Sequence, residues 1–121
     1  MEEIKFSFEE LDVWKKAVTF STEVIQTAEN IQTSRKHFRL IEQLESASTS
    51  IALNIAEGKG RFSKKEFVRF LYIARGSLFE TITLLIIFEN LSWIAKEQLK
   101  YFKKKGDEIG KMLTGLIRAI E

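Results

Sequence analysis

The chain has 121 residues, of which 45% are hydrophobic, and it carries a net charge of only +2 with no cysteine and no proline. This composition excludes a disordered chain and a framework of disulfides or thiolate-bound metals, and the length predicts one domain over residues 1–121. No apolar run approaches the length that spans a bilayer and no signal peptide is recognised, so we expect no membrane partner. The lack of cysteine favours a cytoplasmic location.

The first predicted helix covers residues 11–31, where apolar side chains recur at steps of three and four. Two neighbouring apolar stripes run along it, and Trp14 lies in one of them. Ser7 and Glu10 have the spacing of a capping box just ahead of this helix. The second predicted helix covers residues 36–57, and its apolar seam is rich in alanine and serine, which allows another backbone to approach closely.

The third predicted helix covers residues 64–90. Ser63 and Glu66 predict a capping box, in which the serine oxygen accepts from an early amide and the glutamate reaches back. Residues 64–91 include 16 apolar side chains among 28, against the roughly 12 that a bundle face requires. Together with the double stripe of the first helix, this surplus predicts self-association, because monomers rarely expose large apolar patches.

The fourth predicted helix covers residues 95–120, and its apolar steps of three and four continue without a break. No segment shows a sustained strand alternation. Four long helices with short connections predict an all-α protein, an up-down-up-down antiparallel four-helix bundle.

Residues for enzyme chemistry are scarce, so we expect no enzymatic activity, catalytic residue, metal or cofactor. His37 is the only histidine, and its basic neighbours predict a place on the surface rather than in a Ser-His-Asp triad. A di-iron bundle needs a Glu-x-x-His pair on each of two helices, which the chain lacks. The glycines at 58 and 60 match neither phosphate-loop pattern, and they follow a helix rather than a strand.

The stretch NIAEGKGRFSKKEF at residues 54–67 joins the second and third helices and combines two glycines with positive charge. One interpretation is an ordinary turn, with Gly58 as a left-handed helix end and Gly60 allowing the reversal. The other is a surface that contacts a nucleic-acid backbone. The candidate phosphate contacts are Lys59, Arg61, Lys64, Lys65 and Arg69.

Two details of this stretch favour a partner. Glu57 lies at a helix C-terminus, where the macrodipole disfavours negative charge. Lys65 and Arg69 are like charges one helical turn apart, a mildly destabilising spacing. We expect Glu57 to pair with Arg61, with Arg69 or with a neighbouring subunit, and the lysines to face an anion.

Two other features receive structural interpretations. Gly76 lies inside a long helix, where it costs about 1 kcal/mol relative to alanine, so we expect another helix to pack closely against it. The run Lys103–Lys105 is predicted to be a solvated face, because Asp107 and Glu108 follow at a spacing that allows local ion pairs.

The stretch SIALNIAEGKGRFSKKEFVRFLYIARGSLFE at residues 50–80, with LDVWKKA at residues 11–17, resembles the bacterial rRNA intervening-sequence proteins, a family also labelled as ribosomal proteins. The resemblance implies a compact bundle that assembles as a ring-like homopentamer, without enzymatic activity. It also implies kinship with the accessory protein of diversity-generating retroelements, a basic pentamer that binds nucleic acid. The motif positions, expected at packing or interface contacts, are Trp14, Asn54, Glu57, Gly58, Gly76 and Ser77.

The chain departs from the family pattern after Gln43 and Leu44, where Glu45 and Ser46 replace a frequent pair of arginines. Two function hypotheses follow. The first is a homo-oligomer that binds RNA or DNA through a basic surface. The second is an oligomeric scaffold that binds another protein and no nucleic acid. A single basic face on the assembly would favour the first, and mixed charge would favour the second.

Overall fold

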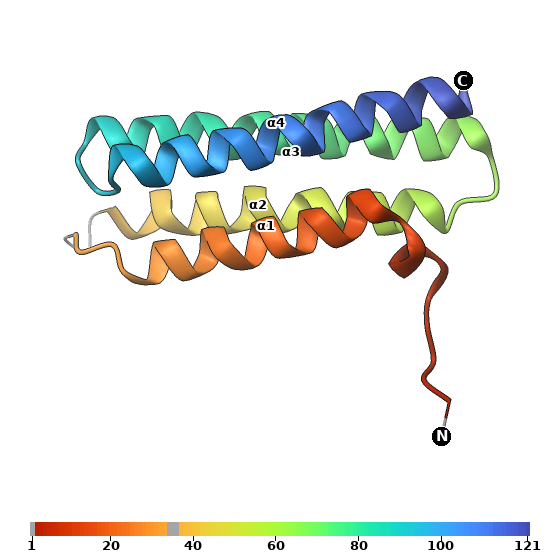
Figure 1. Cartoon of the computed structure of the whole chain (residues 1–121), viewed down its shortest axis with the longest axis horizontal. Coiled ribbons are helices and arrows are strands. Elements are labelled where there is room, and N and C mark those ends of the chain that lie inside the picture. Colours follow the sequence, from red (N-terminus) through yellow and green to blue (C-terminus); the bar gives the residue numbers. More distant parts are fainter. Residues whose placement is uncertain (1, 34–36) are drawn as a thin grey trace.

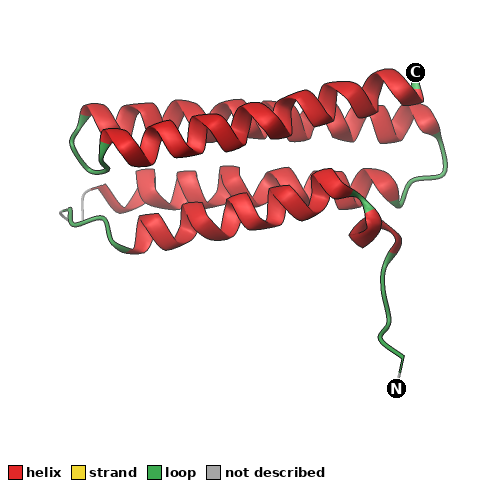
Figure 2. Cartoon of the chain, viewed as in Figure 1, coloured by secondary structure: helices red, strands yellow, loops and turns green. Residues whose placement is uncertain are grey.

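The structure, a computed structural model, describes residues 2–33 and 37–121, over which the chain forms four α-helices, one short 3₁₀ helix and no strand (Figure 2). The elements in chain order are η1 (Ser7–Glu10), α1 (Asp12–Glu29), α2 (Phe38–Lys59), α3 (Lys64–Asn90) and α4 (Lys96–Ile120). Consecutive helices run in opposite directions, and α4 returns to pack on α1 (Figure 1). The predicted all-α, up-down-up-down bundle is confirmed.

The helix bounds lie close to the predicted ones. The third helix coincides with its prediction, and α2 continues two residues past the predicted end at 57. The predicted start of the second helix at 36 lies outside the described residues. The capping box predicted for Ser7 and Glu10 was wrong, because these residues belong to η1 and the Glu9 carboxylate accepts from the Phe6 amide at 2.8 Å.

The core runs along the bundle axis and draws on all four helices. Its largest fully buried side chains include Phe20, Leu44, Ile51, Ile55, Leu71, Phe88, Ile109 and Leu113. These positions follow the predicted steps of three and four. The Phe20 ring meets the Phe102 ring edge to face at 5.9 Å, which joins α1 to α4.

The apolar surplus reaches the surface on α3 but not on α1. Of the large apolar side chains on α1, Val18 alone is exposed, because the second stripe of this helix is its buried face. The prediction that the first helix leaves surplus apolar surface exposed was therefore wrong. On α3 the exposed large apolar side chains are Tyr72, Ile73, Phe79 and Ile87.

Among the described helices, α3 alone is long and apolar enough to cross a membrane by length and composition. Its most apolar 18-residue window has a mean hydropathy of 1.6, so the expectation that no segment approaches such a length was wrong. Within the bundle, 39% of this window is buried, and its buried side chains form part of the core against α2 and α4. Packing in the core accounts for part of its apolar character, and other apolar side chains of α3 are exposed.

Candidate nucleic-acid interface

The turn between α2 and α3 is short and tightly capped. Gly60 ends α2, and the Ser63 hydroxyl accepts from the Glu66 amide at 3.0 Å, which confirms the predicted cap of α3. Gly58 lies within α2, and no glycine among the described residues has a positive φ. The left-handed helix end predicted at Gly58 was therefore wrong.

Gly58 is needed for a different reason, the close approach of α3. A Cβ atom at this buried position would lie 2.7 Å from the Phe70 Cβ and 3.0 Å from the Phe67 Cδ1. Real Cβ atoms are essentially never found so close to another carbon. The missing side chain thus lets the first turns of α3 lie against the end of α2, and this contact positions the charged side chains of the turn.

We call residues 57–69 the basic turn, and two ion pairs order its side chains. Arg61 lies 2.6 Å from the Glu57 carboxylate, which confirms one of the partners predicted for Glu57. Arg69 lies 2.9 Å from the Glu66 carboxylate, so Glu66 binds this arginine rather than reaching back to Ser63 as predicted. The hydrogen bond between them lowers the pKa of Glu66 and raises the pKa of Arg69, and both groups are charged at neutral pH.

The Phe70 ring contacts the same two arginines. The guanidinium carbons of Arg61 and Arg69 lie 4.9 Å and 4.7 Å from the centre of the Phe70 ring. The Lys59 ammonium lies 5.9 Å from the centre of the Phe67 ring. These cation–π contacts, together with the ion pairs, fix the direction of the arginines before any ligand binds.

The remaining cations of the basic turn are open to solvent. Lys59, Lys64 and Lys65 are exposed, and the structure records no ion pair for them within residues 2–33 and 37–121. Five bases and two acids give the basic turn a net charge of +3, more than the +2 of the whole chain. This local positive charge lies where α2 meets α3, at the end of the bundle that also holds η1 with Glu9 and Glu10 (Figure 1).

Phe62 is the residue that sequence reasoning missed. It is fully exposed at the tip of the basic turn, next to Arg61 and two residues before Lys64. An exposed aromatic side chain among lysines and arginines points to a binding role, because an aromatic ring can stack on a nucleobase. The signal was present in the sequence as a phenylalanine between two helices in a polar, basic turn.

Two motif residues, Ser77 of α3 and Asn54 of α2, bond to Ser50 of α2. The Ser50 and Ser77 hydroxyls share a hydrogen bond of 2.8 Å. The Asn54 amide donates to the Ser50 carbonyl at 2.8 Å and to the Ser50 hydroxyl at 2.9 Å. Ser77 thus joins α3 to α2, whereas the bonds of Asn54 lie within α2. Trp14, a third motif residue, packs its ring on Phe8 at 5.2 Å.

Other predicted features lie elsewhere than expected. Gly76 is exposed, and an added Cβ would meet no atom within 4 Å, so the close helix contact predicted there was wrong. His37 is half-buried with its ring 4.9 Å from that of Trp93, rather than on the open surface. Among the described side chains, no group of three or more His, Asp or Glu residues could hold a metal ion.

The local ion pairs predicted for the run Lys103–Lys105 do not form. Asp107 binds Lys111 at 3.0 Å, one turn further along α4. Glu108 binds Lys16 of α1 at 2.6 Å, and this contact lowers the pKa of the Glu108 carboxyl.

Comparison with known proteins agrees with this architecture. The model of a family described as 23S rRNA-intervening sequence protein matches residues 9–115. A crystal structure of a protein of unknown function from the S23 ribosomal protein family of Bacteroides thetaiotaomicron VPI-5482 superposes with a TM-score of 0.81 at 26% identity, covering 88% of this chain and 95% of that one. No match was found among curated proteins.

Proposed function

The chain belongs to the 23S rRNA-intervening sequence protein family, and we propose that it is a non-enzymatic, self-associating bundle that binds RNA or DNA through the basic turn. The family description states no binding activity, and the similar crystal structure is of a protein of unknown function. Support therefore comes from the side chains of the basic turn. The observation that carries the proposal is Phe62, fully exposed among five basic residues.

The basic turn offers two kinds of contact to a nucleic acid. Lys59, Lys64 and Lys65 would contact phosphate oxygens, which gives affinity without reading sequence. The Phe62 ring would stack on a base whose face is free. Because the bases of a duplex are already stacked on one another, this combination favours single-stranded over double-stranded ligands.

The salt dependence of binding tests the phosphate contacts. Fluorescence anisotropy with a short fluorescein-labelled single-stranded RNA measures the affinity at several salt concentrations. Each neutralised phosphate contributes a slope of about −0.7 in a plot of log affinity against log salt. The three lysine contacts would therefore weaken binding about twentyfold when the salt concentration rises fourfold. An absence of binding at low salt would contradict the proposal.

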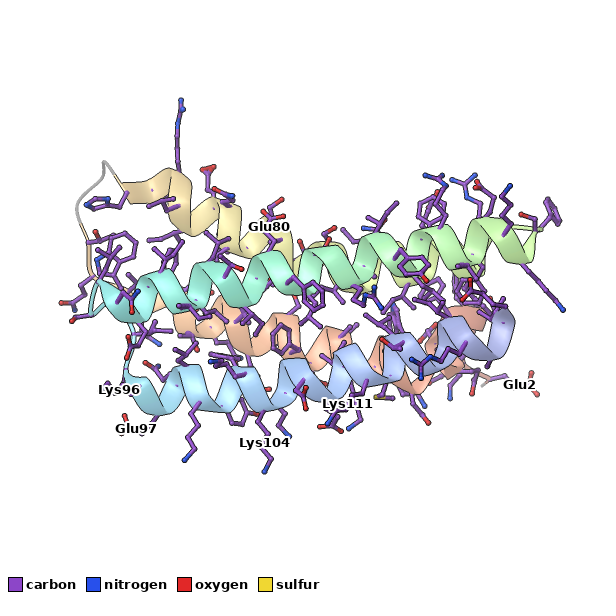
Figure 3. The ribbon with its side chains drawn as sticks, turned by 90° about the horizontal axis from the view of Figure 1, so that it is seen from above. Glu2, Glu80, Lys96, Glu97, Lys104 and Lys111 are labelled. Carbon is purple, nitrogen blue, oxygen red and sulfur yellow. The ribbon has the colours of Figure 1, made fainter. Side chains whose placement is uncertain are left out.

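Substitutions in the basic turn test the site itself. Replacing Phe62→Ser should weaken binding by about 1–3 kcal/mol through the loss of one stacking contact, whereas Phe62→Tyr should bind like the wild type. Lys64→Glu with Lys65→Glu should abolish most of the binding. The matched control is Lys96→Glu with Lys100→Glu, which changes the net charge equally near the other end of the bundle (Figure 3). If the two double substitutions weakened RNA binding equally, the binding site would not be the basic turn.

A second function, an oligomeric scaffold without nucleic-acid binding, is favoured by the exposed apolar side chains of α3, Tyr72, Ile73, Phe79 and Ile87. Both functions share self-association, which we propose takes the form of a homopentamer, as family resemblance suggests. Light scattering should then give about five times the chain mass of 14.1 kDa. A mass of one chain would contradict self-association, and an assembly that binds no RNA or DNA would favour the scaffold.

A further inference from the structure

An open groove of about 880 Å³ lies between α3 and α4. Leu78 and Ile82 of α3 and the glycines at 106 and 110 of α4 contribute to its largely apolar lining, and Phe79, which is 59% exposed, lies beside them. The lining residues of α4 extend from Lys103 to Arg118, which corresponds to about 22 Å of helix at 1.5 Å per residue.

The chain's own packing requires only one of the three glycines that line this groove. A Cβ at Gly106 would lie 2.9 Å from the Ile82 Cδ1, so a side chain there would disturb the contact between α3 and α4. A Cβ at Gly110 would make an ordinary contact of 3.5 Å, and one at Gly115 would meet no atom within 4 Å. Gly110 and Gly115 therefore leave the groove open, although glycine makes α4 less stable than alanine would.

The charged residues of the groove are mostly basic. Four bases and one acid line it, and the acid, Asp107, is paired with Lys111. Arg75 is held toward the groove by a hydrogen bond of 3.2 Å to the Thr114 hydroxyl. An apolar groove with a basic lining fits a segment that combines apolar side chains with carboxylates.

Residues Glu2–Phe6, which we call the arm, combine two apolar side chains with two glutamates and one lysine, Lys5, for a net charge of −1. The arm is extended and leaves the bundle (Figure 1). Ile4 is 87% exposed and Phe6 is 61% exposed. Two residues apart in an extended chain, they point to the same side. Glu2 and Glu3 precede them, and the arm spans about 17 Å at 3.3 Å per residue, less than the length of the groove.

The arm is directed away from the groove of its own chain. Its base is anchored by Phe8, whose ring lies 5.7 Å from that of Phe6 and 5.2 Å from that of Trp14. Within the described residues, η1 contacts α1 and α2 but neither α3 nor α4. The arm continues on the side away from α3 and α4 (Figure 1), and Glu2 lies near the end of the bundle at which α2 meets α3 (Figure 3).

We propose that the arm of one copy occupies the groove between α3 and α4 of a neighbouring copy. Ile4 and Phe6 contact the apolar lining, and Glu2 and Glu3 lie beside its lysine and arginine side chains. The inference rests on the self-association in the proposed function and names one contact that produces it. Because arm and groove are different surfaces, each copy can donate one arm and receive another, an arrangement that closes as a reciprocal dimer or as a larger ring.

Cysteine cross-linking tests this contact directly, since the chain contains no cysteine. An Ile4→Cys variant with an affinity tag is mixed with an untagged Gly110→Cys variant and oxidised, and the mixed dimer is identified by its size. The control mixture pairs Ile4→Cys with Ala95→Cys, an exposed position at the other end of α4. We expect the mixed dimer with Gly110→Cys to exceed the control at least fivefold. A yield no greater than the control would overturn the proposal.

Light scattering separates failure of this inference from failure of the proposed self-association. Ile4→Ser with Phe6→Ser, and separately Gly110→Leu, should weaken assembly at least tenfold, and circular dichroism should show intact helices. Ala95→Leu, which adds a leucine outside the groove, should assemble like the wild type. A wild type that assembles, with variants that assemble equally well, overturns only the contact between arm and groove. A monomeric wild type overturns the self-association as well.

Discussion

Helix α3 packs against its two neighbours in different ways. Toward α2 the contact is closed, because Gly58 admits Phe70 and the Ser50 and Ser77 hydroxyls are hydrogen-bonded. Toward α4 it leaves an open groove, lined in part by Gly110 and Gly115. Glycine thus has two roles in this chain. On one side it lets the chain's own helices approach, and on the other it leaves space that the chain itself does not fill.

The largest effect is expected at the closed contact. Replacing Gly58→Ala should lower the free energy of unfolding by about 1–3 kcal/mol, because the new Cβ would lie 2.7 Å from a Cβ that cannot rotate away. Urea unfolding measures the change. Gly76→Ala is the matched control, since its Cβ would meet no atom within 4 Å, and like Gly115→Ala it should not lower the free energy of unfolding. If both variants proved as stable as the wild type, the contact of α2 with α3 would not be closed.

A smaller loss is expected from the polar contact between the same helices. Ser77→Ala removes the hydrogen bond to Ser50, which keeps its bonds to Asn54, so the free energy of unfolding should fall by about 0.5–1.5 kcal/mol. A double-mutant cycle with Ser50→Ala isolates the coupling. Strictly additive losses would show that the two hydroxyls do not interact.

On the side of α3 that faces α4, replacing a glycine by alanine should stabilise the fold rather than destabilise it. Gly115→Ala should raise the free energy of unfolding by about 0.5–1 kcal/mol, because alanine restricts the unfolded chain and meets no atom in the fold. Thermal unfolding should show a higher Tm. A lower Tm would mean that the groove is filled within the chain's own fold.

The smallest effect concerns pH. The hydrogen bonds between α2 and α3 do not titrate, whereas Glu108 of α4 binds Lys16 of α1, which lowers the pKa of Glu108. The contact therefore contributes stability above the usual glutamate pKa of 4.5 and loses it as the pH falls through the lower, folded pKa. Urea unfolding over this range should show less acid destabilisation for Glu108→Gln. If the wild type and Glu108→Gln lost stability equally as the pH fell, the lowered pKa of Glu108 would be contradicted.

Local patterns predicted the local features of the fold. The helices follow from apolar steps of three and four, and the Glu57–Arg61 pair follows from their spacing of one turn. The role of Gly58 could not be derived, because a left-handed helix end and a close helix approach both require a residue without a side chain. The Lys16–Glu108 pair joins α1 to α4, and sequence spacing carries no signal for it.

The candidate site was predicted in its charges but not in its arrangement. The five bases of the basic turn were identified, whereas the contacts of Arg61 and Arg69 with Phe70 depend on how α3 meets α2. Phe62 was overlooked because exposure cannot be read from residue type, and phenylalanine is more often buried. Its position between two helices, within a run of bases, was the available signal.

The most direct test of nucleic-acid binding is to locate where a bound strand touches the protein. Single-stranded RNA that carries 4-thiouridine is cross-linked to the protein by ultraviolet light at low salt, and the modified peptides are identified by mass spectrometry. The proposed function predicts cross-links at the basic turn, with Phe62 and its neighbours, and their loss in Phe62→Ser. Cross-links confined to the lysines of α4, or none at all, would contradict it.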